Sequence, residues 1–254
     1  MLTRADSKLL HALKSRSGRE KHAAFVVEGV RVVEEAVAAG FDLQFAVASP
    51  TLEDNERGRA LAEKLSQITA IRRVTDLREI AETETPQGVL AVARIPTRSL
   101  DDVVMKDRAL LLVLDAVQDP GNVGTLIRAA DAFAADAVIA LQGTVDYWSS
   151  KVVRAAAGAT FHLPLINATD AEVWKWLRGH DVELCGAEMN GETAAEAKLG
   201  RRVALFAGNE GGGLREGTRS RLDKLLAIPM PGNAESLNVA VAAGILLYEL
   251  SKRT

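Results

Sequence analysis

The chain of 254 residues has one cysteine, few aromatic residues and no metal-ligand motif, and each shortage excludes a class of protein. A single cysteine, Cys185, excludes an internal disulfide framework. The four histidines are scattered and follow no HExxH or paired-cysteine spacing, so we expect no metal site. Aromatic residues make up 4% of the chain, and the apolar 48% is mostly Ala, Val and Leu. This composition favours an α/β protein with helices packed on a parallel sheet.

Long apolar runs are also lacking. The longest, from Val239 to Tyr248, is about half as long as a bilayer-spanning helix. Residues 1–19 contain no apolar core of the kind found in a signal peptide. We therefore expect a cytoplasmic protein with no membrane partner.

Net positive charge is absent, but the cations are unevenly distributed. Lys and Arg total 31 against 34 Asp and Glu, a net charge of −3, which by itself argues against a nucleic-acid partner. The first 21 residues nevertheless hold six basic and two acidic residues, a local net charge of +4. Leucines at helical spacing predict an amphipathic helix here, with the cations on its polar face. That face is either simply solvated or a contact for the RNA backbone; its cations include Lys8, Lys14, Arg16, Arg19 and Lys21.

The pattern of strands and helices predicts two α/β domains. Residues 1–95 form the first, 96–107 a linker without sustained periodicity, and 108–254 the second. In the first domain we expect strands at 24–27, 43–48 and 88–93 and helices at 30–39 and 57–67. In the second we expect strands at 109–114, 137–141, 182–187, 203–207 and 226–228, and helices from about 122, at 151–157, at 171–177 and at 237–250.

Three loops follow predicted buried strands at their carboxyl ends, at 119–128, 208–213 and 230–238. Ligands of open α/β sheets bind at that edge, so we expect the loops to be neighbours. Their glycines allow backbone N–H groups to approach a ligand closely. Neither glycine loop matches GxGxxG with a following acid or GxxxxGK[ST], which leaves a Rossmann oxidoreductase and a P-loop ATPase as weak alternatives. Taken singly, each loop could also be a plain tight turn.

Together the three loops carry an ordered set of motifs. The first is NVGTLIR at 122–128, the second GNEG at 208–211, and the third combines IPM at 228–230 with SLNVA at 236–240. In this order and spacing they closely resemble the three motifs of the SpoU/TrmH family of RNA 2′-O-ribose methyltransferases.

The resemblance extends over nearly the whole chain. It includes KVVRAAAG at 151–158, where Ala156 stands at a position usually occupied by serine in the family. In the first half, FVVEG at 25–29 and TPQG at 85–88 resemble the L30e-like domain with which the family binds its RNA substrate.

The resemblance implies a fold, a cofactor and an assembly. The second domain is expected to be a parallel-sheet α/β domain whose C-terminal segment forms a deep trefoil knot, a rare exception to ordinary chain connections. S-adenosylmethionine is the implied cofactor, and a homodimer with the active site at its interface is the implied assembly. The apolar closing helix fits either that interface or a monomer core. The cofactor-binding residues implied are Gly208, Ile228, Leu237, Ala207, Met230, Leu141 and Gly143.

Methyl transfer to a ribose requires an aligned 2′-oxygen and a route for its proton. Arg128 is the first catalytic candidate, as a fixed cation that binds phosphate and stabilises the developing alkoxide. Deprotonating an arginine at neutral pH costs about 7 kcal/mol, so a general-base role is unfavourable. We expect Glu210 to pair with Arg128 or Asn122. The remaining candidates are Asn238, which bonds the ribose or Asn122 or caps the closing helix, and Ser236, which supports its loop.

Other residues are assigned to RNA or to packing. The family resemblance implies that Lys151 and Arg154 lie on the RNA-facing side, and the basic N-terminal segment is expected to contact the RNA backbone. Tyr147 and Trp148 either stack on a base or pack in the core, and packing is favoured. Cys185 lies in an apolar strand and is expected to be buried and inert.

The predicted function is S-adenosylmethionine-dependent methylation of a ribose 2′-hydroxyl. A separate N-terminal domain favours 23S rRNA over tRNA as the substrate. The alternatives are a tRNA 2′-O-methyltransferase and a non-catalytic RNA-binding or ribosome-assembly protein of the same fold. The non-catalytic alternative is disfavoured because a protein without turnover need not retain four polar groups on three loops, at 122, 128, 210 and 238.

Overall fold

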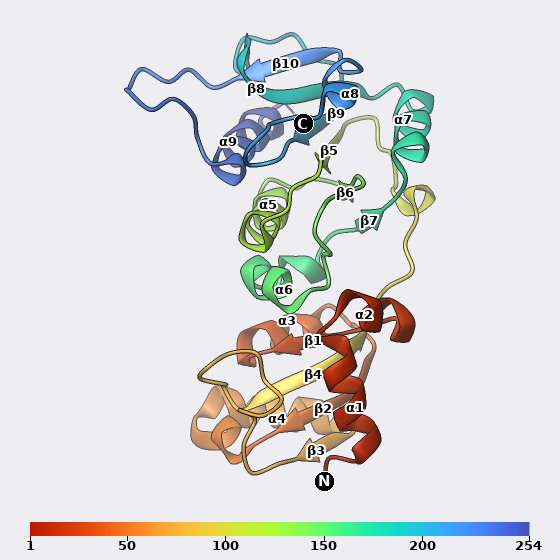
Figure 1. Ribbon diagram of the computed structural model, residues 1–254, viewed down its shortest axis with the longest axis vertical. Helices are drawn as coiled ribbons and strands as arrows, with labels where there is room; N and C mark the ends of the chain where they lie inside the picture. The colour runs from red at the N-terminus through yellow and green to blue at the C-terminus, as the bar shows by residue number, and fades with distance from the viewer. Residues whose placement is uncertain (254) are drawn as a thin grey trace. The chain divides into compact units, whose positions relative to one another are not determined.

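The computed structural model describes residues 1–253, and the chain divides into two units, each described here by itself (Figure 1). The first unit comprises Met1–Pro96 and Asp146–His162, and the second comprises residues 97–145 and 163–253. The segment Asp146–His162 differs from the predicted division, which placed it in the second domain.

The first unit contains a mixed four-stranded sheet in the order β1-β4-β2-β3. Strands β1 (Ala24–Glu28) and β2 (Leu43–Ala48) both run antiparallel to β4 (Val89–Arg94), whereas the short β3 (Ile71–Arg73) runs parallel to β2. Only β3 was not predicted, because Ile-Arg-Arg is too short to show a strand pattern. The helices of this part are α1 (Arg4–Leu13), α2 (Arg16–His22), α3 (Val30–Ala38) and α4 (Glu56–Ile68), with a 3-10 turn, η1, at Pro50–Asp54.

Helices α1 and α2 form because each has its own N-cap. Thr3 and Asp6 make a reciprocal capping box at α1, and the Ser15 hydroxyl accepts a hydrogen bond from the Gly18 N–H at α2. The apolar face of α1 turns inward through Leu10 and Leu13, which join the sheet in the core of this unit. The polar face of the helix remains exposed, as the leucine spacing predicted.

Aromatic packing explains why Asp146–His162 belongs to the first unit. This segment contains α6 (Ser150–Ala156) and a 3-10 turn, η3 (Ala159–Phe161). The ring of Trp148 lies 4.6 Å from that of Phe25 in β1, and the ring of Phe161 lies 4.8 Å from that of Phe41. Tyr147 and Trp148 are both buried, so they pack in the core and the base-stacking alternative is wrong.

The second unit is built on a six-stranded sheet, parallel throughout, in the order β10-β8-β9-β5-β6-β7. All six residues of β5 are buried, as expected for an apolar strand covered on both faces. The predicted α/β parallel-sheet fold is confirmed, while the knot stays a prediction of the family resemblance. The strands are β5 (Ala109–Leu114), β6 (Ala137–Ala140), β7 (Leu165–Asn167), β8 (Glu183–Thr193), β9 (Arg202–Ala207) and β10 (Lys224–Ala227).

Helices cover both faces of this sheet. Helices α5 (Pro120–Ala132) and α9 (Val239–Ser251) pack against each other on one side, and α7 (Asp170–Gly179) lies on the other (Figure 1). The short α8 (Glu216–Arg219) follows β9, and a 3-10 turn, η2 (Leu100–Asp102), interrupts the predicted linker.

Helix α9 is apolar on its outer face as well as its inner one. Ala243, Leu246 and Leu247 are buried against the rest of the second unit. The side chains exposed on the other face are also large and apolar: Val241, Ile245 and Tyr248, at 50%, 37% and 48% exposure. Within residues 1–253, no helix has the length and apolar character that a membrane crossing requires.

Candidate functional site

The carboxylate of Glu210 joins two of the three motif loops. Glu210 lies just after β9, and its Oε1 accepts hydrogen bonds from the Asn122 side-chain amide at 3.0 Å and from the Asp119 N–H at 3.1 Å. Its Oε2 accepts a longer bond, 3.4 Å, from the Gln118 N–H. The loop after β5 is therefore fixed to the loop after β9 by one side chain.

Asn238 adds the third loop. Its Nδ2 donates to the Oδ1 of Asn122 at 2.9 Å, and its own Oδ1 accepts from the N–H groups of Ala240 and Val241 at the start of α9. Both alternatives for Asn238, the bond to Asn122 and the helix cap, are thus realised together. The three loops are neighbours, as their positions after buried strands predicted.

Hydrogen bonding controls the charge of Glu210. Burial acts to raise the pKa of its carboxyl group, but the bonds from the Asn122 amide and from backbone N–H groups outweigh it, and the net pKa is lowered. Glu210 is therefore ionised at neutral pH and a weak proton acceptor, which suits a residue that orients its neighbours.

Arg128 stands apart from this network. It is exposed on α5, and no hydrogen bond or ion pair engages its guanidinium within the described part of the chain. Glu210 pairs with Asn122 rather than with Arg128. Three of the predicted catalytic residues thus meet directly, and Arg128 remains free to contact something else.

A cavity of about 540 Å³ lies beside the network. The glycine-rich loop, the middle of β8, the loop after β10 and α9 form its walls. Six of the predicted site residues line it: Gly208, Glu210, Ile228, Met230, Ser236 and Leu237.

Three predicted cofactor residues are not part of the lining. Ala207 and Leu141 are buried at the ends of β9 and β6. Gly143, at φ 95°, sits against Ala116, because a Cβ built on it would lie 3.1 Å from the Ala116 Cβ. Their place near the cofactor stays a prediction of the family resemblance.

The glycines give the cavity a wall of bare backbone. A Cβ on Gly208 would come within 2.3 Å of the Gly213 backbone, so the loop can close only with glycine there. A Cβ on Gly212 would meet nothing within 4 Å and would stand in open space. The main chain can therefore approach a ligand directly at this wall.

Several residues that support this site were not predicted from the sequence. Asn209 donates from Nδ2 to the Ala116 carbonyl at 2.9 Å. Asp115, fully buried after β5, pairs with Arg215 just beyond the glycine loop. A single acid directly after six apolar residues was the signal that could have identified Asp115.

The predicted RNA-contact residues divide into two groups. Lys8, Lys14, Lys21 and Lys151 are exposed and have no ion-pair partner among residues 1–253. Arg16 is exposed and pairs with Glu20 at 2.8 Å. These five remain available at the surface of the first unit.

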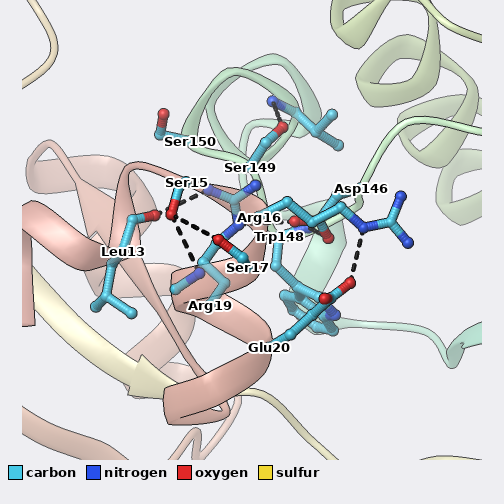
Figure 2. A network of polar contacts seen from close by, with 12 residues as sticks. Leu13, Ser15, Arg16, Ser17, Arg19, Glu20, Asp146, Trp148, Ser149 and Ser150 are labelled. Atoms are coloured by element: carbon cyan, nitrogen blue, oxygen red, sulfur yellow. Dashed lines mark hydrogen bonds and ion pairs between the residues drawn. The ribbon is translucent and has the colours of Figure 1, made fainter.

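Arg19 is the exception on α2, as Figure 2 shows. It is 6% exposed; its Nε donates to Asp146 at 2.7 Å, and its Nη1 donates to the carbonyls of Leu13 and Lys14. Its predicted RNA contact is therefore corrected: Arg19 joins the end of α1 to the segment that carries α6.

Arg154 faces acidic side chains of the first unit. Its Nη1 lies 3.8 Å from the buried carboxylate of Glu28 and 3.9 Å from Glu82. Its guanidinium is partly exposed, so its contact with RNA stays a prediction.

Metal ligation and thiol chemistry have no support in the described residues. No group of three or more His, Cys, Asp or Glu side chains in residues 1–253 is placed to hold a metal ion. Cys185 is buried, and burial together with the neighbouring Glu183 carboxylate raises the pKa of its thiol to about 12. The predicted burial of Cys185 is confirmed, and its inertness stays a prediction.

Comparison with known proteins identifies the family. Residues 109–248 match the SpoU rRNA Methylase family, and residues 6–91 match an MRM3-like substrate binding domain. The chain belongs to the SpoU rRNA methylase family. The resemblance inferred from the three motifs is confirmed.

Relatives match this SpoU-family chain over most of its length. It is 37% identical to the 23S rRNA (guanosine(2553)-2′-O)-methyltransferase RlmP of Bacillus subtilis, over 96% of this chain and 94% of that protein. It is 31% identical to the 23S rRNA (uridine(2479)-2′-O)-methyltransferase of Streptomyces viridochromogenes, over 93% of this chain and 85% of that protein.

Solved structures agree with these relatives. The SpoU methyltransferase AviRb from Streptomyces viridochromogenes, in complex with AdoMet, aligns with a TM-score of 0.89 at 29% identity, covering 98% of this chain and 97% of its own. A structure described as giving insights into the 2-OH methylation of C/U34 on tRNA aligns at 0.52 and 31% identity, covering 58% of this chain and 97% of its own.

The lowered pKa of Glu210 predicts a pH-dependent stability. An unfolded glutamate has a pKa of about 4.3, so the Glu210 carboxylate stabilises the folded state above that pH and loses this effect as pH falls through its lower folded value. Glu210→Gln should therefore be less stable than the wild type near about pH 6.5, with the difference shrinking towards about pH 3.5. Urea unfolding at both pH values measures it.

The matched control is Glu216→Gln, which changes an exposed glutamate that lines the same cavity and whose carboxylate accepts no hydrogen bond within residues 1–253. Its effect should be smaller than that of Glu210→Gln at the higher pH. A destabilisation by Glu210→Gln that stays constant with pH would contradict the role given to the carboxylate.

Proposed function

We propose that this chain transfers a methyl group from S-adenosylmethionine to the ribose 2′-hydroxyl of a nucleotide in 23S rRNA. The observation that carries the proposal is the Glu210–Asn122–Asn238 network, which joins the three SpoU motif loops beside one cavity. The names of the two relatives support 23S rRNA as the substrate class. A cytoplasmic location follows from that substrate.

The cavity suits the cofactor in size and in chemistry. Its volume of about 540 Å³ lies in the range of small-molecule sites, roughly 300–1,000 Å³. Ile228, Met230 and Leu237 supply apolar surface for an adenosyl group, and the bare backbone around Gly212 supplies hydrogen-bonding groups. S-adenosylmethionine bound there supplies an electrophilic methyl group on its sulfonium.

The two asparagines are placed to orient a ribose. Each side-chain amide has two N–H groups. Asn122 gives one to Glu210 and Asn238 gives one to Asn122, so each retains one without a partner in the described chain. The Ser236 hydroxyl lines the cavity and likewise has no partner there. These groups can hold the sugar hydroxyls while Glu210 keeps Asn122 in place.

Arg128 supplies the fixed positive charge in this proposal. Its exposed guanidinium can bind the phosphate of the target nucleotide in a bidentate manner and stabilise the alkoxide that develops on the 2′-oxygen. The phosphate or water, rather than arginine, then accepts the proton, because a neutral arginine is too costly to form at neutral pH.

A homodimer explains why Arg128 lies outside the cavity lining of its own chain. The exposed stripe Val241, Ile245 and Tyr248 recurs at helical spacing on α9. Helix α9 packs on α5, the helix that carries Arg128, with the rings of Phe133 and Tyr248 5.6 Å apart. We propose that a second copy covers this stripe and that the active site forms at the interface.

The first unit is assigned to RNA binding. It contains the region matched by the substrate-binding domain, and its exposed cations Lys8, Lys14 and Lys21 can neutralise backbone phosphates. The tRNA-related structure covers 58% of this chain and leaves the rest without a counterpart, which favours the rRNA assignment over tRNA.

Mapping of 2′-O-methyl groups tests the substrate. Mass spectrometry of 23S rRNA and tRNA, from cells with and without this protein, should show one 23S rRNA mark that disappears with the gene and returns on complementation. Loss of a tRNA mark alone would reject the rRNA assignment, and no lost mark in either RNA would favour the non-catalytic alternative.

Replacing Arg128 tests the mechanism. Arg128→Ala should lower kcat for the native RNA by about 10²-fold or more, as expected for loss of a charge that stabilises a developing oxyanion. Lys175→Ala, which removes an exposed cation of α7 that has no ion-pair partner in residues 1–253, serves as the control and should leave kcat unchanged. Methylation by Arg128→Ala at a near wild-type rate would show that the mechanism is wrong.

Replacing Ile245 tests the assembly. Ile245→Glu places a charge in the middle of the α9 stripe, where burial in a dimer interface would be strongly unfavourable. Light scattering coupled to size-exclusion chromatography should show a dimer for the wild type and a monomer for the variant. The control, Ile68→Glu, changes an exposed isoleucine of α4 and should remain dimeric. A monomeric wild type would reject the proposal.

A further inference from the structure

Arg215 lies immediately beyond the glycine-rich loop, outside the motifs that identify the family. It does not line the cavity, yet it bridges two carboxylates, one directly after β5 and one at the start of α7. We propose that Arg215 is a positioning residue, which presets the conformation of the loop Gly208–Gly213 for cofactor binding. The inference rests on the proposed function, because it names the cofactor as S-adenosylmethionine.

The first carboxylate is that of Asp115, at the end of β5. Asp115 is fully buried, and its backbone N–H donates to the Ala207 carbonyl at 2.8 Å. Its carboxylate accepts from the Arg215 N–H at 2.9 Å and from the Arg215 Nε. A buried carboxylate is strongly unfavourable without a paired charge, so Asp115 fixes both the main chain and the side chain of Arg215.

The second carboxylate is that of Asp170, at the start of α7. Its Oδ2 accepts from Arg215 Nη2 at 2.8 Å, and its Oδ1 accepts from the Gln142 N–H at 3.2 Å. Gln142 belongs to the loop after β6. Arg215 therefore joins the loop after β5 to the start of α7, and Asp170 extends this connection to the loop after β6. These partners differ from those of Glu210.

The other end of the glycine loop is anchored to the adjacent residue of the β5 loop. Asn209 donates from Nδ2 to the carbonyl of Ala116, and its backbone exchanges two hydrogen bonds with Gly213, at 2.8 and 2.9 Å. Asp115 and Ala116 thus hold the two ends of the glycine loop. Ala116 itself is in the left-handed region, at φ 59°, so this anchor has a defined backbone conformation.

Between these anchors the loop has few side chains to hold it. Gly211, Gly212 and Gly213 all line the cavity, and glycine has more backbone freedom to lose on ordering than any other residue. A ligand that must order the loop itself binds more weakly than one that meets an ordered loop. The anchor at Arg215 should therefore act mainly on cofactor affinity.

An arginine is needed because the two carboxylates are reached by different nitrogens. Nε contacts Asp115 while Nη2 contacts Asp170, which uses the planar fork of the guanidinium. The single ammonium group of a lysine cannot reproduce this geometry. Arg215→Lys should therefore keep part of the stability that Arg215 gives the fold, but little of its effect on the conformation of the loop Gly208–Gly213.

The test compares Arg215→Gln with the wild-type protein. Calorimetric titration with S-adenosylmethionine should give a Kd raised about tenfold or more, with KM for the cofactor raised in parallel and kcat at saturation within about threefold of the wild type. Amide hydrogen exchange without cofactor should become faster in peptides covering 208–215, while peptides from β5 and β9 keep their protection.

A double variant separates positioning from stability. Arg215→Gln leaves the buried Asp115 carboxylate without its cation and should lower the Tm. Adding Asp115→Asn removes that buried charge, so the double variant should recover most of the lost Tm. The Kd should stay raised in the double variant. Recovery of Kd together with Tm would show that Arg215 acts through stability alone and would overturn the proposal.

The control is Arg178→Gln in α7. Arg178 also bridges a carboxylate and a second acceptor, Asp223 at 2.9 Å and the Arg221 carbonyl at 2.8 Å, and it does not line the cavity. Its Kd for S-adenosylmethionine should equal that of the wild type. An unchanged Kd in Arg215→Gln rejects this inference; a wild-type protein that neither binds the cofactor nor methylates RNA rejects the proposed function instead.

Discussion

The carboxyl edge of the parallel sheet depends on one ionised side chain. Glu210 accepts hydrogen bonds from the side chain of Asn122 and from the main chain of the same loop, and Asn122 in turn receives one from Asn238. No two of these residues are neighbours in sequence: Asn122 lies in the first turn of α5, Glu210 in the glycine-rich loop, and Asn238 at the N-cap of α9. The backbone hydrogen bonds of the sheet stop where its strands end. Beyond that point, hydrogen bonds made by side chains order the edge.

Charge balance differs between this edge and the layer beneath it. Glu210 lies at the surface and is stabilised by neutral amides and N–H groups. Asp115 lies in the interior and requires a full positive charge, which Arg215 supplies from beyond the glycine loop. Within residues 1–253, the Glu210 carboxylate therefore pairs with no cation, and the Arg128 guanidinium pairs with no anion.

The features of the fold and the site that could be predicted from the sequence are those set by residues close together in the chain. Strand β5 was predicted with its observed bounds, because six apolar residues between charges can form little else. The proximity of Asn122, Glu210 and Asn238 followed from the motif order and the rule that loops at one sheet edge meet. The local pattern also predicted α9 as an apolar helix, but it could not distinguish a core helix from an interface helix.

The failures concern partners distant in sequence. Arg19 has the same local setting as its exposed neighbours, and only Asp146, 127 positions away, shows that its guanidinium is buried. The assignment of Asp146–His162 failed for the same reason, since its partners Phe25 and Phe41 precede it by more than a hundred residues. A single sequence records charge and apolarity but not which distant side chain satisfies them.

The placement of Asp146–His162 has a consequence for the order of folding during synthesis. The first unit contributes its four strands within the first 94 residues, yet Phe25 is covered by rings at Trp148 and Phe161. A nascent chain that ended at Pro96 would expose these aromatic surfaces to water. Domains usually fold one after another as they leave the ribosome, the N-terminal one first. Here the N-terminal unit can cover Phe25 only after β5 and β6 of the second unit have been made.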